Sequence, residues 1–149
     1  FHPLCNEPVL CQGRRRLCNG ILLSKRIIIM AYDDQNVFAK ILRGEIPCRK
    51  IDEDEFCLSF ADVNPQASVH VLVIPKGAYI DWNDFAANAS AEEITGFTRA
   101  IRRVAEKTGI LDSGYRVISN IGAHGHQEVP HLHMHVLGGG PIGRLVAGQ

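Results

Sequence analysis

The chain has 149 residues, 46% hydrophobic and 21% charged, which is the ordinary composition of a single globular domain. Its formal net charge of zero argues against a protein that coats nucleic acid. No apolar stretch approaches the roughly 18–20 residues that cross a bilayer. The odd number and irregular spacing of the five cysteines argue against a disulfide framework and a structural zinc site. We therefore expect a cytoplasmic protein that binds neither nucleic acid nor membrane.

Residues 1–29 differ from the rest of the chain. They contain five basic side chains against the single acid Glu7, and they show neither helical nor strand periodicity. Met30, followed by Ala31, has the character of a natural start. We interpret residues 1–29 as a leader outside the fold, either an upstream extension or a vector-derived sequence, and 30–149 as a single domain.

A short amphipathic helix is predicted next, followed by three strands. Asn36 offers an N-cap oxygen, and apolar residues recur at helical spacing from Val37 to Leu42. Strands are expected at 49–52, 56–61 and 69–74. The last of these is apolar on both faces, which is typical of a central strand. Its one polar residue is His70, which taken alone is more often a hydrogen-bonded core histidine than a functional one.

The second half begins with a longer helix. Residues 78–89 suggest only one helical turn, but Ser90 and Glu93 form a capping box that opens a helix over 90–108. Gly96 inside this helix costs about 1 kcal/mol relative to alanine, which indicates a close contact. The buried stripe is expected to be Ile94, Phe97, Ile101 and Val104.

Two further strands complete the fold. Residues 115–120 are the first, and a loop at 122–127 leads to the last. Two main helices and five strands in this order predict an α+β fold with a five-stranded antiparallel sheet.

The last strand contains a row of histidines. His131, His133 and His135 stand at every second position, so a strand shows all three on one face and gives Leu132 and Met134 to the core. Residues two apart on a strand are separated by roughly 6.6 Å, whereas zinc needs nitrogens about 2.0–2.1 Å from one point. Three consecutive ligands of one metal are therefore not expected. A solvated strand face is the plain alternative, but it explains one exposed histidine and not three in register beside a glycine-rich stretch. The functional interpretation is one nucleophilic imidazole whose neighbours bind charge or move protons.

The glycine-containing loop beside this row suggests a phosphate ligand, because backbone N–H groups freed by such loops bind anions. GxxxxGK[ST] is absent from the sequence, and no GxGxxG opens a helix within a strand–helix–strand unit, as the dinucleotide-binding fingerprint requires.

The segment from His131 to Leu137 resembles the His-x-His-x-His-x-x signature of the histidine triad (HIT) superfamily, with x apolar. Further segments resemble its nucleotide-binding, Hint-type branch: 38–41, 44–47, 60–67, His70 with 73–76, Asn120 and 125–129. The resemblance runs from about residue 36 to 140.

This resemblance implies a homodimer whose sheets pair edge to edge. It also implies hydrolysis of nucleoside 5′-phosphoramidates and aminoacyl adenylates, with a purine nucleotide such as AMP as ligand and no cofactor. Two functional alternatives remain open. One is a dinucleoside polyphosphate hydrolase of the Fhit-like branch, and the other is a nucleotide-binding regulator with incidental turnover.

The resemblance also implies a role for each matching residue. His133 corresponds to the nucleophile, His131 and His135 to the flanking histidines, and His70 to a buried histidine beside them. Groups for the phosphate and the leaving group are Asn120, Gln127, Glu128 and Val129. The nucleoside pocket is expected from Val37, Phe38, Phe60, Asp62 and Val63. For Phe60 and Val63, plain core packing is the alternative.

Two departures from the pattern affect the leaving group. Glu128 stands where some relatives have a serine, and a carboxylate beside a phosphate repels it. We therefore expect Glu128 to point away from the phosphate or to meet the leaving amine. The tail at 141–149 lacks the tryptophan that some relatives carry.

Overall fold

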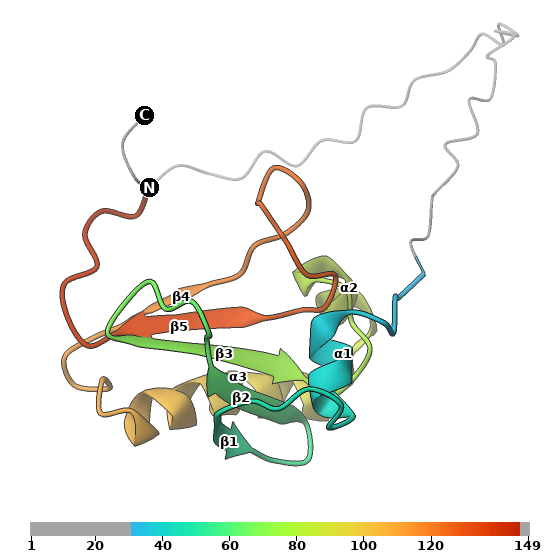
Figure 1. The fold of residues 1–149 in the computed structure, drawn as a ribbon, viewed down its shortest axis with the longest axis horizontal. Helices are drawn as coiled ribbons and strands as arrows, with labels where there is room; N and C mark the ends of the chain where they lie inside the picture. Colours follow the sequence, from blue (N-terminus) through green and yellow to red (C-terminus); the bar gives the residue numbers. More distant parts are fainter. Residues whose placement is uncertain (1–30, 147–149) are drawn as a thin grey trace, which may run out of the picture. The chain divides into compact units, whose positions relative to one another are not determined.

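One antiparallel sheet organises the protein, as the computed structural model of residues 31–146 shows (Figure 1). Its order is β1-β2-β3-β5-β4. The strands are β1 Lys50–Glu53, β2 Cys57–Ala61, β3 Val69–Pro75, β4 Arg116–Ile118 and β5 Met134–Gly138. The predicted α+β fold with five antiparallel strands and a central third strand is confirmed. The leader predicted at 1–29 lies outside the described residues and stays a prediction.

Both predicted main helices are present, with a third between them. Helix α1 spans Val37–Leu42, and Asn36 caps it by accepting from two backbone N–H groups. Helix α3 spans Ala91–Lys107 and begins with the predicted capping box of Ser90 and Glu93. Helix α2, Trp82–Asn88, is longer than the single turn that the sequence suggested. No helix among the described residues is long and apolar enough to cross a membrane.

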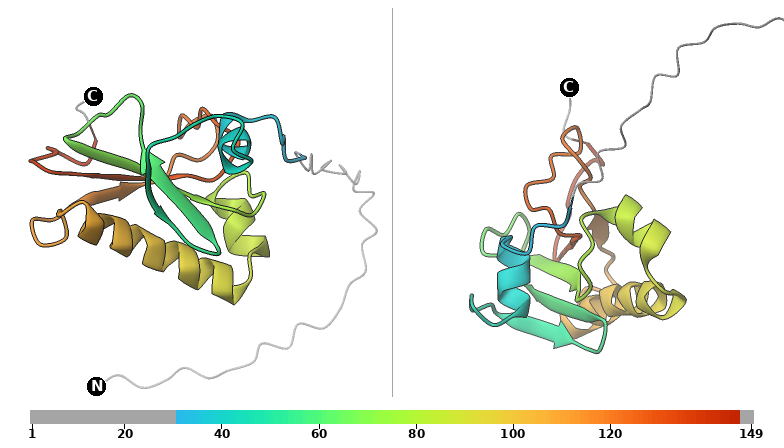
Figure 2. Two further views of the ribbon diagram at one scale, coloured as in Figure 1. Left: turned by 60° about the horizontal axis from the view of Figure 1, so that its bottom comes forward. Right: turned by 90° about the vertical axis from the view of Figure 1, so that its right-hand side faces the viewer.

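Helices α1 and α3 lie on opposite sides of the sheet (Figure 2). The alternation of strand side chains explains this arrangement. In β3, Val71 and Val73 pack with α3, whereas Leu72 and Ile74 pack with Phe38 of α1. The central strand is therefore apolar on both faces because each face is covered by a helix.

The buried stripe of α3 differs in part from the predicted one. Phe97 and Val104 are buried as expected, but Ile94 is 38% exposed, and Ala100 and Ala105 complete the contact. Small side chains let the helix lie close to the sheet, and Ile94 falls at the margin of that contact. The expected close contact at Gly96 is present, because a Cβ there would lie 2.5 Å from the ring of Phe56.

The histidine row is less regular than the predicted strand. Hydrogen-bonded strand structure begins only at Met134, which pairs with Val73, although β3 itself continues to Pro75. Before Met134, the Leu132 N–H donates to the Tyr79 carbonyl instead. The predicted alternation nevertheless holds, since Leu132 and Met134 enter the core beneath α3. The fourth strand is also shorter than the expected 115–120.

Candidate active site

A pocket of about 1200 Å³ lies on the α1 side of the sheet. Helix α1, the end of β2, strands β3 and β5 and the loop between β4 and β5 all contribute to its wall. The predicted site residues that line it are Val37, Phe38, Phe60, Asp62, Val63, His70, Asn120, Glu128, Val129, His133 and His135. Two predicted residues, His131 and Gln127, are not part of its lining.

One end of the pocket is apolar and aromatic. Phe38 and Phe60 meet edge to face with ring centroids 5.7 Å apart, and both are largely buried. They belong to the same packed cluster as Leu72, so they stabilise this face and also line the pocket. Val63 is fully exposed at the rim, which is inconsistent with the alternative that it is a core residue.

His133 presents one free ring nitrogen. Its Nδ1–H donates to the carbonyl oxygen of His131 at 2.7 Å, so its Nε2 keeps the lone pair. Phe38 and His135 flank the ring edge to face, each with a centroid separation of 5.1 Å. Burial lowers the pKa of His133, and the imidazole is therefore neutral near pH 7. A neutral, fixed imidazole with one available lone pair is the form that acts as a nucleophile.

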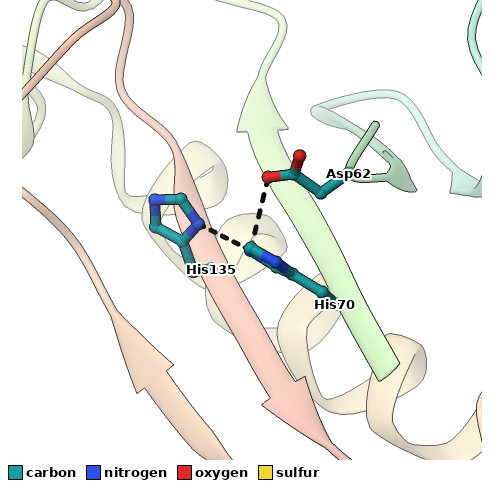
Figure 3. A group of neighbouring side chains, drawn as sticks. All are labelled: Asp62, His70 and His135. Carbon is teal, nitrogen blue, oxygen red and sulfur yellow. Dashed lines mark hydrogen bonds and ion pairs between the residues drawn. The ribbon is translucent and has the colours of Figure 1, made fainter. Parts of the chain in front are cut away.

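His70 and His135 form a directed hydrogen-bonded pair (Figure 3). The Gln66 backbone N–H donates to His70 Nδ1 at 3.0 Å, so neutral His70 carries its proton on Nε2. That proton is donated to His135 Nδ1, 2.9 Å away. His135 must then carry its own proton on Nε2, which is buried and has no partner among the described residues. Burial lowers the pKa of His135 to about 4 and also lowers that of His70.

Asp62 joins this pair at the edge of the pocket. Its Oδ2 lies 3.3 Å from His70 Nε2, and its Oδ1 accepts the Asn64 N–H at 2.8 Å. One potential ligand atom from each of Asp62, His70 and His135 falls within 4.8 Å of the others, a spacing that a metal ion could use. The hydrogen bonds favour a different use, because the His70 nitrogen that would bind a metal already holds a proton.

His131 is completely buried, and both of its ring nitrogens are engaged. Nε2–H donates to the Pro75 carbonyl at 2.9 Å, and Nδ1 accepts the hydroxyl of Tyr32 at 2.5 Å. Burial lowers the pKa of His131 to about 4. No ring nitrogen is left for a phosphate oxygen, so this geometry does not support the flanking, phosphate-orienting role that the resemblance implied.

The loop before the row is braced by Gln127. Its side-chain amide donates to the carbonyls of Ile80 and Val129 and accepts the Gly122 N–H, so it is occupied by backbone groups of its own loop and of the segment before α2. Glu128, next along the chain, lines the mouth of the pocket with a highly exposed carboxylate 3.3 Å from His126 Nε2. This position is compatible with an amine that leaves towards solvent.

Several contributing groups were not identified from the sequence. Tyr32 lies outside any periodic segment, and the Gln66 N–H and Pro75 carbonyl are backbone groups that carry no residue-type signal. Ser119 donates from Oγ to the His133 carbonyl at 3.2 Å. These groups form hydrogen bonds to the rings of His131 and His70 and to the backbone of His133. Their contacts become visible only in the folded chain.

Comparison with known proteins gives consistent matches. The model of the HIT domain family matches residues 43–142. A 13.2 kDa HIT-like protein of Azospirillum brasilense is 55% identical over 115 residues, covering 77% of this chain and 94% of its own length. The purine nucleoside phosphoramidase of Escherichia coli K12 is 41% identical over 117 residues, covering 76% of this chain and 95% of that protein.

Solved structures show the same fold. A HIT family hydrolase from Clostridium thermocellum has a TM-score of 0.70 at 38% identity, covering 76% of this chain and 98% of the other. A structure described as a HIT-like protein has a TM-score of 0.65 at 48% identity, covering 70% and 99% respectively.

Proposed function

The chain belongs to the HIT domain family, and from this premise we propose that it hydrolyses nucleoside 5′-phosphoramidates and aminoacyl adenylates. The observation that carries the proposal is the geometry of His133. Its Nδ1–H is tied to its own backbone, and its Nε2 lone pair is available beside a pocket large enough for a nucleotide. The 41% identity to a purine nucleoside phosphoramidase supports the substrate class.

The proposed reaction takes two displacements at the α-phosphorus. In a phosphoramidate, His133 Nε2 forms a bond to phosphorus while the P–N bond breaks, and the leaving nitrogen takes one proton from solvent to depart as the amine. In an aminoacyl adenylate the P–O bond to the acyl group breaks instead, and the carboxylate leaves without a proton. Water then breaks the P–Nε2 bond, yields the nucleoside monophosphate and releases one proton. Splitting the reaction in this way replaces water with a better nucleophile in the difficult first step.

The other pocket groups take complementary roles in this proposal. Phe38 and Phe60 contact the purine, and the Asp62 carboxylate accepts from the ribose hydroxyls. His135 Nε2–H, a buried donor without a partner in the described residues, donates to a phosphate oxygen or the leaving nitrogen. Asn120 lines the pocket near the phosphate, and Glu128 lies where the amine departs.

The nucleotidyl-histidine intermediate provides the test. Wild-type protein mixed with an adenosine phosphoramidate and quenched in base should carry one added nucleotide on the peptide that contains residues 131–135. His133→Ala should lack this adduct and turn over at least about a thousandfold more slowly. AMP should still bind to the variant within about tenfold, because the aromatic pocket and Asp62 are unchanged.

The same assay separates the alternatives. Faster turnover of diadenosine tri- or tetraphosphate than of the phosphoramidate would favour the Fhit-like activity. Tight AMP binding with no turnover of any of these substrates would favour a regulator. An adduct that maps to His131 or His135, or near-normal turnover by His133→Ala, would refute the proposed nucleophile.

We further propose a cytoplasmic homodimer. Strand β4 has only three residues and leaves Val117 39% exposed at the edge of the sheet, where pairing with a second copy would cover it. Cys48 and Cys57 are both free thiols, as expected in a reducing compartment. Sedimentation at micromolar concentration tests the dimer, and a monomeric mass would contradict it.

A further inference from the structure

We infer that Tyr32 and Asn36 position the catalytic histidine row, which makes the segment just before α1 a working part of the site. The inference rests on the proposed function and deepens it. It begins from His131, which is fully buried and does not line the pocket. A buried histidine with both nitrogens engaged is a rigid element, and its geometry is set by the groups that engage it.

The Tyr32 hydroxyl determines the state of the His131 ring. Since His131 Nε2–H donates to the Pro75 carbonyl, Nδ1 must accept, and the Tyr32 hydroxyl is the donor in contact with it. Together these two bonds fix both the tautomer and the rotation of the ring. Tyr32 also packs edge to face against His131, with centroids 5.6 Å apart.

Asn36 determines which way the Tyr32 proton points. Its Oδ1 accepts the N–H groups of Phe38 and Ala39, so the other side-chain atom is the amide nitrogen. That Nδ2–H donates to the Tyr32 oxygen at 3.0 Å. The hydroxyl oxygen therefore accepts from Asn36, which has no free acceptor for the hydroxyl proton, and that single proton is directed to His131. One buried amide thus caps α1 and orients the hydroxyl at the same time.

The connection to the nucleophile passes through the backbone of His131. The His131 carbonyl is the acceptor for His133 Nδ1–H, at 2.7 Å. The Leu132 N–H belongs to the same planar peptide unit as this carbonyl and donates to the Tyr79 carbonyl at 2.8 Å. The two bonds of the His131 side chain add a second restraint on the same residue, and the carbonyl so held aims the His133 ring. Because residues 131–133 precede the hydrogen-bonded part of β5, the sheet does not provide this restraint. Tyr32 and Asn36 also lie before residue 43, where the match to the family model begins.

Tyr32→Phe in the full-length chain is the first test, because it removes the hydroxyl and keeps the ring. We expect kcat for the adenosine phosphoramidate to fall about tenfold, because the residue whose carbonyl aims His133 loses one of the two buried hydrogen bonds of its ring. KM and AMP affinity should stay within twofold, since the pocket lining is untouched. The ¹⁵N shift of His131 Nδ1 should move towards that of an imidazole nitrogen without a donor.

Tyr79→Phe is the matched control. Its hydroxyl is also partly buried and donates to a side chain, the carboxylate of Glu93. Tyr79 contacts the histidine row through its backbone carbonyl, which accepts the Leu132 N–H and is unchanged by the substitution. This variant should show a comparable change in melting temperature with no change in kcat. If Tyr32→Phe lowers kcat no more than Tyr79→Phe does, or leaves the His131 nitrogen shift in place, the inference is wrong.

Asn36→Asp tests the direction of the Tyr32 proton. An aspartate still caps α1, but its carboxylate only accepts, so it competes with His131 for the hydroxyl proton. We expect the same loss of kcat as in Tyr32→Phe, and no further loss when the two changes are combined. Full additivity in the double variant would show that Asn36 acts elsewhere, for example through its bond to the Asp33 carbonyl.

These outcomes are distinct from a failure of the proposed function. If the wild type turns over no phosphoramidate, adenylate or dinucleotide, the proposed function fails before any variant is compared. The His131 nitrogen shifts are then still measurable in wild type and both variants. They would continue to report whether Tyr32 and Asn36 hold the ring.

Discussion

The two faces of the sheet are built differently, although they share the same strands. The face beneath α3 is closed by a helix of 17 residues and filled with aliphatic and aromatic side chains. The opposite face carries the six-residue α1, and beside it lie the histidines and the pocket. In β5 and the residues just before it, neighbouring side chains alternate between the two. The apolar packing on the α3 face therefore fixes the strand backbone that carries the pocket histidines on the other face.

The polar groups follow the same division. On the α3 side, the buried Asp52 is paired with Arg103 and Lys107, so its charge is compensated. On the pocket side, the buried imidazoles are neutral and are held by hydrogen bonds to backbone groups, to Tyr32 and to one another. Neutral buried bases are stable only while the pH keeps them unprotonated, which makes the pocket face the one that is sensitive to acid.

The largest expected effect is a loss of stability from a substitution that disturbs only the packing on the α3 face. Phe97 is 1% exposed and packs against Phe85 with centroids 5.1 Å apart. Phe97→Ala should lower the free energy of unfolding by about 3–5 kcal/mol, through lost burial and the cavity that remains. Below its melting temperature the variant should keep its KM for nucleotide. Urea unfolding and steady-state kinetics measure the two quantities.

Ile94→Ala on the same helix is the control for this experiment. Ile94 is 38% exposed, so the change should cost less than about 1 kcal/mol. If Phe97→Ala instead raised KM strongly while leaving stability intact, the division of labour between the faces would be incorrect.

The second prediction concerns acid and the pocket face. Burial lowers the pKa of His131 to about 4, below the value of about 6.5 that the unfolded chain has. The unfolded state therefore binds protons first as the pH falls, and stability is lost between about pH 6.5 and 4. For His131 the loss is on the order of 3 kcal/mol. His135, whose pKa burial also lowers to about 4, adds to it in the same direction.

Urea unfolding at a series of pH values between 7 and 4.5 measures this loss. Much of this window lies above the range near pH 4 in which ordinary carboxylates titrate. The matched control is His124→Gln, which removes an exposed loop histidine and should leave the curve in place. A stability that stayed constant from pH 7 to 4.5 would show that the row is not buried as a neutral group.

Much of this architecture was predictable because it rests on local patterns. The capping box at Ser90, the apolar run of β3 and the alternation around His133 each follow from a short period in the sequence. The close approach at Gly96 was predictable for the same reason, since an interior helical glycine has a cost that needs compensation. The resemblance then supplied a list of pocket residues, most of which the structure brings together.

The parts that could not be predicted depend on long-range contacts. Tyr32 and His131 are 99 positions apart, and the sequence around Tyr32 has no period that indicates its partner. The engagement of Gln127 within its own loop depends on the Ile80 carbonyl, a backbone group. Spacing also could not show that strand pairing starts only at Met134, because the preceding Leu132 N–H donates to the distant Tyr79 carbonyl and not to β3.

The smallest expected effect comes from removing one serine hydroxyl, either beneath α3 or beside the histidine row. Ser59 is 1% exposed in β2, and its hydroxyl has no hydrogen-bond partner among the residues that the structure describes. Ser59→Ala should therefore leave the free energy of unfolding unchanged or raise it by up to about 1 kcal/mol, because an unpaired buried hydroxyl is removed. Ser119→Ala removes the bond to the His133 carbonyl and should lower it by about 1 kcal/mol. Equal losses in both variants, measured by urea unfolding, would mean that Ser59 does have a partner in solution, and the α3 face would then be less purely apolar than its packing indicates.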